Sequence, residues 1–227
     1  MRSETDAQAR KIARTVLVYR LASLLMRVLS RLFLRLKVEG DDLVPREGSL
    51  LVVSNHISVM DPPFLAGTFP RPLAFMGKTE LFRNRVLAVL LPAFRTFPVR
   101  RGEVDVGAVR LSLALLKDGQ ALVVFPEGTR HPDGLGAAAP GIGYLATKSR
   151  CRVLPVGIVG SQQIRGVASV LQRPTVRVAF GQPFTIDTQS NEEAAEQIMR
   201  SIAALLPPDK RGHYSAAAPP PDGVREA

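Results

Sequence analysis

Residues 50–65 read LLVVSNHISVMDPPFL, an apolar run followed by a polar turn and a pair of prolines. The apolar run predicts a strand buried on both faces of a sheet, because such strands are continuously apolar. The prolines after Asp61 predict the start of a helix, since the first helical turn tolerates proline. A strand, a turn and a helix therefore follow one another, and the turn places His56 and Asp61 five residues apart.

The same layout returns at residues 123–130, VVFPEGTR, where an apolar strand ends in polar residues. The remaining chain alternates short apolar runs with helical patterns, which predicts an α/β fold with a mixed, largely parallel sheet flanked by helices. The expected strands are 34–39, 50–54, 73–76, 96–99, 121–125, 153–159 and 175–180. The expected helices are 62–68, 79–91, 104–117, 141–148 and 191–206. Ligands gather at strand carboxyl ends in such sheets, and both polar segments follow such ends.

The His56–Asp61 pair has two interpretations. A turn between the residues can bring the carboxylate to one ring nitrogen, which fixes the tautomer and leaves the other nitrogen as a base. Asp61 can equally cap the helix that begins at the prolines, and both roles are compatible. A base held by a carboxylate can deprotonate a hydroxyl, and an arginine beside a glycine turn can hold a phosphate. The residues thus point to acylation of a phosphate-bearing alcohol.

The composition of the chain limits the domain count, the kind of binding partner and the role of cysteine. The chain of 227 residues has 46% apolar residues and fits one α/β domain with a modest extension. Its net charge is +10, and residues 1–39 hold nine basic against three acidic side chains, so the partner is a polyanion such as anionic lipid or nucleic acid. The single cysteine, Cys151, excludes an intrachain disulfide and a multi-cysteine zinc site, and is expected to pack beside a strand.

The amino-terminal segment, residues 7–36, has leucines at helical spacing and arginines on the opposite side, at 20, 27, 31 and 35. This pattern favours a helix lying in a membrane interface, with a core helix that has a solvated basic face as the alternative. The start of the chain does not resemble a signal peptide, and no run of about 18 apolar residues predicts a membrane span.

Three segments are therefore expected. Residues 1–36 form an amphipathic basic helical segment, residues 37–206 form the α/β domain, and residues 207–227 form a disordered tail rich in proline and alanine.

Four blocks in order resemble the glycerolipid acyltransferase family, typified by 1-acyl-sn-glycerol-3-phosphate acyltransferases. They are Asn55-His56 with Asp61; FPVRRG at 97–102 with Asp105; FPEGTR at 125–130, which matches in full; and VLPVG at 153–157. The segment MGKTELF at 76–82 resembles the family's lysine-bearing segment. The resemblance covers roughly residues 35–185.

The resemblance implies roles for single residues. His56 is the general base that activates the acceptor hydroxyl, and Asp61 orients it. Acceptor and phosphate binding then falls to a set of residues in three of the blocks, namely Lys78, Arg101, Glu127, Gly128, Thr129 and Arg130. Acyl-CoA or acyl carrier protein (acyl-ACP) serves as co-substrate, and neither a cofactor nor a metal is implied.

The implied reaction converts lysophosphatidic acid to phosphatidic acid. It is expected to take place at a membrane surface with anionic lipid, and the protein is expected to be peripheral or monotopic, on the cytoplasmic face. One departure concerns Ala138 and Ala139, where the family usually has an aromatic and a basic residue. Another lysophospholipid or a specialised acceptor is therefore a second hypothesis. A non-enzymatic basic protein that binds membranes or nucleic acid is the third, although the absence of Trp and of a recognisable module counts against nucleic acid.

Overall fold

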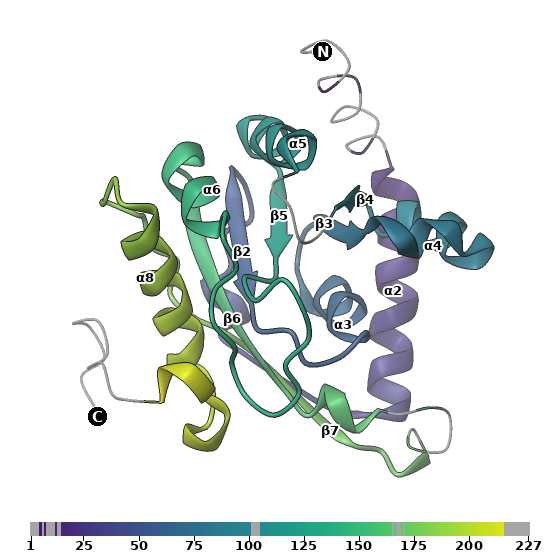
Figure 1. Ribbon diagram of the computed structural model, residues 1–227. Coiled ribbons are helices and arrows are strands. Elements are labelled where there is room, and N and C mark those ends of the chain that lie inside the picture. The colour runs from purple at the N-terminus through teal and green to yellow at the C-terminus, as the bar shows by residue number, and fades with distance from the viewer. Residues whose placement is uncertain are drawn as a thin grey trace.

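The computed structural model describes Thr5, Ala7, Ile12 and residues 15–100, 105–164, 166, 169 and 171–215. In these residues a seven-stranded sheet has the order β1-β7-β6-β2-β5-β3-β4 (Figure 1). The strands are β1 Arg35–Glu39, β2 Leu50–Ser54, β3 Leu73–Lys78, β4 Thr96–Val99, β5 Ala121–Val124, β6 Arg152–Val159 and β7 Thr175–Phe180.

The sheet is mixed and largely parallel, which confirms the predicted fold class. The strands β6, β2, β5, β3 and β4 pair in parallel, β7 pairs antiparallel with β6, and β1 pairs parallel with β7. The carboxyl ends of the five parallel strands therefore meet at one edge of the sheet. The segments that follow these ends supply the candidate site.

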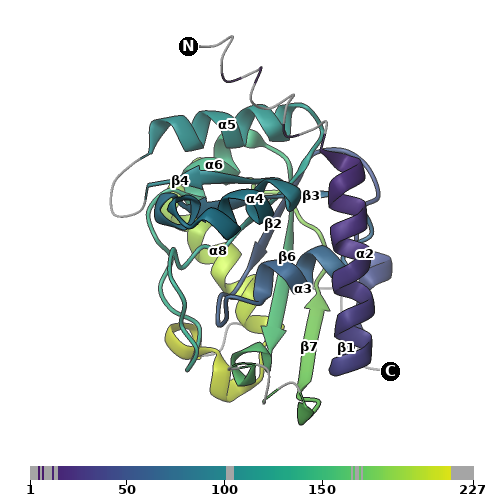
Figure 2. The same cartoon turned by 90° about the vertical axis from the view of Figure 1, so that its right-hand side faces the viewer.

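Helices cover both faces of the sheet (Figures 1 and 2). Alternate residues of β2 enter two separate hydrophobic cores: Leu51 and Val53 pack in one, and Leu50 and Val52 in the other. The first core includes buried residues of α5, α6 and α8, and the second includes buried residues of α3. The helices are α2 Val16–Phe33, α3 Asp61–Thr68, α4 Arg85–Ala93, α5 Val106–Lys117, α6 Ile142–Ser149 and α8 Asn191–Ala204.

The predicted helix over residues 7–36 ends earlier than expected. The helix α2 stops at Phe33, and β1 begins at Arg35 and joins the sheet, so the expected boundary between residues 36 and 37 falls inside a strand. Leu34 is the reason, because it leaves the helix in an extended conformation with its side chain buried in the core. Most of residues 7–14 lie outside the described part of the chain.

The disordered tail was predicted to begin at residue 207, but the chain is still ordered there. Residues Pro208–Lys210 and Gly212–Tyr214 form short 3-10 helices, and Tyr214 is buried in the core beside α8. Backbone hydrogen bonds join Leu135 to this segment, through Lys210 O and His213 N. The proline pair at 207–208 therefore starts an ordered turn that docks on the domain, and residues 216–227 lie outside the described residues.

The expected helix over residues 79–91 divides into two. Thr79–Arg83 forms a 3-10 helix, and α4 starts after Asn84, whose side chain accepts hydrogen bonds from Val86 N and Leu87 N. An N-capping asparagine inside the predicted span thus separates the two turns. Among the described helices, none is both long enough and apolar enough to cross a membrane.

Candidate active site

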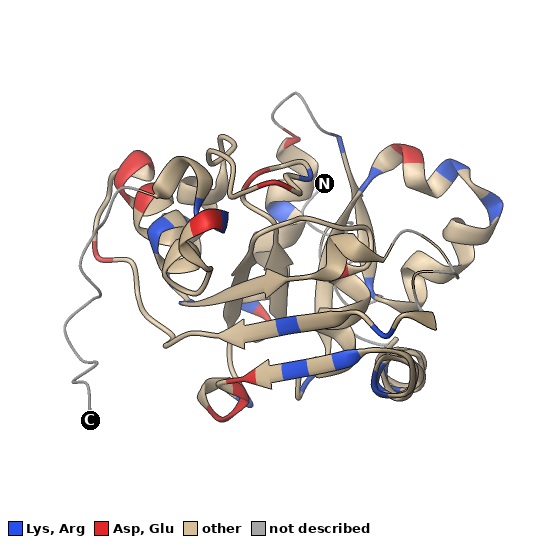
Figure 3. Cartoon of the chain, turned by 90° about the horizontal axis from the view of Figure 1, so that it is seen from below, with Lys and Arg blue, Asp and Glu red and all other residues tan. Residues whose placement is uncertain are grey.

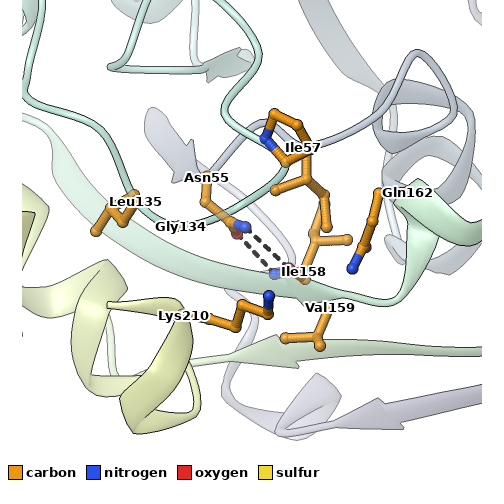
Figure 4. A pocket seen from close by; sticks show the side chains of 9 residues that line it. Asn55, Ile57, Gly134, Leu135, Ile158, Val159, Gln162 and Lys210 are labelled. Carbon is orange, nitrogen blue, oxygen red and sulfur yellow. Dashed lines mark hydrogen bonds between the residues drawn. The ribbon is translucent and has the colours of Figure 1, made fainter. Parts of the chain in front are cut away.

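Asn55 fixes the turn that follows β2. Its side-chain amide donates to Ile158 O at 2.8 Å and accepts from Ile158 N at 2.7 Å (Figure 4). These two bonds continue the ladder between β2 and β6 beyond its last register pair, Ser54 with Val156. Lys210 and Gln162 line the hollow beside this clamp. The backbone that carries His56 is therefore tied to the adjacent strand.

The structure brings His56 and Asp61 into direct contact. His56 Nδ1 lies 2.8 Å from Asp61 Oδ2, and this oxygen also accepts from Ile57 N and Ser58 N at 2.8 Å each. Asp61 is fully buried and His56 nearly so. Because Oδ2 already accepts from these two backbone N–H groups, it also acts as the acceptor toward the imidazole, so Nδ1 carries the proton and donates it. The other nitrogen, Nε2, has no hydrogen bond to any residue the structure describes and is free to act as a base.

Asp61 does not cap α3, which corrects the second sequence interpretation. It is the first residue of that helix, the N-cap position belongs to Met60, and no side chain caps the helix. The carboxylate instead turns back onto residues 56–58, because those backbone N–H groups and the imidazole surround it. Ser161 Oγ donates to the second carboxylate oxygen, Oδ1, at 2.5 Å.

Glu127 links the turn after β2 to the loop that contains Gly136. Its Oε2 accepts from His56 N at 2.6 Å and its Oε1 accepts from Gly136 N at 2.8 Å, and the side chain is buried. Burial raises the pKa of this carboxyl from 4.5 to about 7, although the two backbone N–H groups oppose the rise. These contacts account for a loop-fixing role, and contact of Glu127 with an acceptor remains a prediction.

Phe125 packs on the imidazole, and Gly128 shapes the turn that follows β5. The Phe125 ring stacks on His56 with centroids 4.2 Å apart and planes 22° apart. Gly128 has a φ of +68°, and an added Cβ would lie 3.2 Å from that of Ala139. The left-handed backbone conformation at this turn favours glycine and directs the following residues, Thr129 and Arg130, outward.

The two predicted cationic residues that the structure describes, Lys78 and Arg130, lie along the same edge of the sheet. Lys78 ends β3, Arg130 follows β5, and these two strands are neighbours. Thr129 and Arg130 are exposed, and Arg130 forms no ion pair or hydrogen bond with the described residues. Lys78 is also exposed and lies 3.4 Å from Glu80 Oε1. Arg101 follows β4 but lies outside the described residues.

The sequence interpretation missed Ser161. It lies two residues after the end of β6, is fully buried and contacts Asp61 from a position 100 residues later in the chain. The rule that polar residues after strand ends form the site had found His56 and residues 127–130, and it finds Ser161 when applied to β6 as well.

Neither a metal cluster nor a reactive cysteine is evident in the described residues. No group of three or more His, Cys, Asp or Glu side chains among them could hold a metal ion. Cys151 precedes β6, at the opposite end of that strand from the site, where it is buried and burial raises the pKa of its thiol. It packs in the core, as the sequence indicated.

The model of the acyltransferase family matches residues 35–159, which is more than half of the chain. The chain belongs to the acyltransferase family. This acyltransferase is 28% identical over 166 residues to the 1-acyl-sn-glycerol-3-phosphate acyltransferase of Streptococcus pneumoniae, a match that covers 71% of this chain and 61% of that protein. It is 27% identical over 167 residues to the protein of the same name from Bacillus subtilis, covering 73% of this chain and 82% of that protein.

Other relatives are longer than the matched region. The chloroplastic 1-acyl-sn-glycerol-3-phosphate acyltransferase of Arabidopsis thaliana is 29% identical over 157 residues, or 66% of this chain, and the match spans 44% of the plant protein. The chain thus spans about half the length of several relatives. The crystal structure of the 1-acyl-sn-glycerophosphate acyltransferase of Thermotoga maritima has the same fold, with a TM-score of 0.62, 23% identity, and coverage of 88% of this chain and 94% of that one.

Proposed function

We propose that this protein moves a fatty acyl group from acyl-CoA or acyl-ACP to the free hydroxyl of lysophosphatidic acid, giving phosphatidic acid. The observation that carries the proposal is the buried His56–Asp61 pair, in which Asp61 accepts a hydrogen bond from Nδ1–H and leaves Nε2 open. The names of the relatives support the substrate class. A purely structural or binding role does not require a buried carboxylate that fixes one imidazole tautomer.

In the proposed reaction, His56 acts first as a general base and then as a general acid. As the acceptor oxygen attacks the thioester carbonyl, Nε2 takes the hydroxyl proton. The tetrahedral intermediate then collapses, the carbon–sulfur bond breaks, and the thiolate leaves with the proton from the imidazolium. No acyl-enzyme is required, because the acceptor oxygen attacks the thioester directly. The one cysteine is buried in the core, away from the strand ends that carry His56.

The acceptor phosphate is assigned to the exposed basic residues beside the histidine. Arg130 has no carboxylate partner in the described chain, and Lys78 ends the strand next to β5. An arginine can bind phosphate with two parallel hydrogen bonds, whereas lysine acts as a point charge. We therefore assign the main phosphate contact to Arg130 and supporting contacts to Lys78, Thr129 and Arg101.

We further propose that α2 attaches the protein to a membrane surface with anionic lipid. One face of α2 packs on the domain, where Tyr19 and Ser30 are buried and Arg27 Nε donates to Gly67 O at 2.8 Å. The other face is apolar and exposed, with Leu17, Val18, Leu21, Leu24, Leu25, Val28 and Leu32 each at least 52% exposed. Basic positions lie on α2 and on β1, the next element along the chain (Figure 3). Apolar residues flanked by basic ones match the interface of an anionic bilayer, where lipid substrates reside.

A product screen tests the reaction. Purified protein is mixed with acyl-CoA or acyl-ACP and with vesicles that contain one acceptor at a time: lysophosphatidic acid, lysophosphatidylglycerol, lysophosphatidylethanolamine or monoacylglycerol. Mass spectrometry is expected to show phosphatidic acid as the main product. Preferred acylation of another lysophospholipid would support the second hypothesis, which Ala138 and Ala139 motivate, and no acylated lipid from any pair would contradict the proposal.

A further inference from the structure

The Asp61 carboxylate is held unevenly at its two oxygens. Oδ2 accepts from His56 Nδ1 and from the backbone N–H groups of Ile57 and Ser58, all within the turn after β2. Within the described chain, Oδ1 accepts a hydrogen bond only from Ser161 Oγ. The distance of 2.5 Å is short, as expected of an O–H donor to a carboxylate. Ser161 is thus the one described contact to this carboxylate from outside the turn.

Ser161 is held rigidly in this position. It follows Gly160, whose φ is +93° and where an added Cβ would lie 2.1 Å from Thr175 O of β7. The chain can therefore turn this closely against β7 only with glycine at 160. The Asn55–Ile158 clamp fixes β6 against β2 three residues before Ser161. The serine hydroxyl thereby has a fixed location relative to the His56 turn.

We propose that Ser161 is a positioning residue for the reaction, which fixes the rotation of the Asp61 carboxylate so that Oδ2 holds the Nδ1–H of His56. This inference rests on the proposed function. The carboxylate torsion of aspartate has broad rotational preferences, so it needs contacts at both oxygens to stay in one orientation. The hydroxyl also satisfies an oxygen that water does not reach, since both residues are fully buried. Ser161 lies two residues beyond the segment that the family model matches.

Four variants test the proposal by kinetics. Ser161→Ala removes the donor, Ser161→Cys keeps nearly the same volume with a weak donor, and Ser161→Thr keeps the hydroxyl. Ser112→Ala is the matched control, because Ser112 is also buried and its Oγ donates to Ala108 O at 2.7 Å, on α5. Ser161→Ala is expected to lower kcat about ten- to a hundredfold, since it leaves a buried acceptor unsatisfied, with KM changed by less than about twofold. Ser161→Thr is expected to retain most of kcat, Ser161→Cys to be intermediate, and Ser112→Ala to match the wild type.

Proton NMR adds a readout that does not depend on turnover. The His56 Nδ1–H resonance is recorded in protein without substrate and is assigned by its loss in His56→Ala. Ser161→Ala is expected to shift or broaden this resonance, whereas Ser112→Ala leaves it unchanged. If the alanine variant does not fold, the volume-matched cysteine variant carries both measurements.

The outcomes separate the two proposals. An unchanged resonance and unchanged kcat in folded Ser161→Ala or Ser161→Cys would overturn the role of Ser161. Equal losses in Ser161→Thr and Ser161→Ala would also overturn it, because the hydroxyl would then not be what matters. If the wild type shows no acyl transfer, the proposed function fails, while the resonance still decides whether Ser161 orients the Asp61–His56 pair.

Discussion

The histidine side and the basic side of the site occupy the carboxyl ends of neighbouring strands, yet their charged groups are held very differently. The histidine side consists of Asn55, His56, Asp61, Glu127 and Ser161, all of them buried and hydrogen-bonded within the protein. The basic side, which in the described chain consists of Lys78, Thr129 and Arg130, is exposed.

This difference follows the chemistry that each side supplies. A base must already have its tautomer and direction fixed when the substrate arrives, because reorganisation during the reaction raises the barrier. A phosphate clamp must stay open until the phosphate binds, and an arginine already paired with a carboxylate would have to break that pair first. In the proposed function the histidine side is therefore preorganised, whereas the basic side would be completed by the acceptor phosphate.

The largest expected effect is the loss of kcat when His56 or Asp61 is replaced, and it tests whether the two residues act as one catalytic unit. General-base catalysis contributes about 10²–10⁴-fold, so His56→Ala is expected to lower kcat by that factor. Asp61→Asn is expected to cause a large loss in the wild type and almost none in the His56→Ala background, because residues that act as a unit are not additive. If the two losses of kcat multiply in the double variant, His56 and Asp61 act independently, and the proposed pair is contradicted. Far-UV circular dichroism and Tm serve as controls for folding.

The pH dependence of stability tests the burial of Glu127. Its pKa is raised from 4.5 to about 7, so the folded state binds a proton more tightly than the unfolded state. The resulting stability is complete below pH 4.5 and is lost as the pH rises through about 7. With about 1.4 kcal/mol for each pKa unit, the loss is on the order of 3 kcal/mol.

Glu127→Gln removes this titration, so the unfolding free energy of the wild type minus that of the variant should decrease between pH 4.5 and 7.5. Urea unfolding at several pH values measures it. A difference that stays constant across that range would show that the Glu127 carboxylate is not buried as described. Glu193→Gln, at an exposed residue near the start of α8, is the control for a glutamate outside the site.

Arg130→Ala probes the basic side. Loss of a charge-assisted contact costs about 1.5–3 kcal/mol, so kcat/KM for lysophosphatidic acid is expected to fall about ten- to a hundredfold. The KM of the acyl donor should hardly change, and monoacylglycerol, which has no phosphate, should be acylated as well by the variant as by the wild type. Arg200→Ala, on α8 and paired with Glu196, is a control for loss of an exposed arginine. Equal losses with both acceptors would remove Arg130 from phosphate binding.

The smallest expected effects concern membrane attachment through α2. Arg20→Glu and Arg31→Glu should weaken flotation with anionic vesicles by about 1 kcal/mol for each basic residue lost, and added salt should abolish that difference. Arg27 is left intact because it bonds Gly67 O. Replacing Leu21, Leu24 and Leu25 by Gln should remove the salt-insensitive part. Val106→Gln, an exposed apolar residue of α5, is the control, and unchanged flotation of the leucine variant would show that α2 serves only the domain.

The sequence predicted the positions of most of the strands, because each central strand is a continuous apolar run. The strand β2, for example, lies at Leu50–Ser54 as expected. The sequence-based prediction was wrong where a single residue or turn changed the local structure. Leu34 ends the first helix, and Asn84 divides the expected second helix. The turns after Pro207 pack on the domain, although the sequence had predicted a disordered tail there.

At the candidate site, too, the sequence predicted local contacts but not contacts between distant segments. Local spacing was enough to place Asp61 beside His56, because one turn joins them. Contacts between strands distant in the chain could not be foreseen: Asn55 with Ile158, Glu127 with the backbone of His56, and Ser161 with Asp61 all depend on the order of strands in the sheet. One sequence without the strand order can propose candidate site residues, but it cannot give the contacts that those residues make with distant strands.

The most direct test of the account is acceptor-dependent release of thiol from acyl-CoA by purified protein, measured for the wild type and for His56→Ala with and without lysophosphatidic acid. The account predicts rapid release only by the wild type and only with the acceptor present, with one phosphatidic acid formed for each thiol released. Release by folded His56→Ala at the wild-type rate, or release by the wild type that does not depend on the acceptor, would contradict the claim that the buried His56–Asp61 pair activates the acceptor hydroxyl.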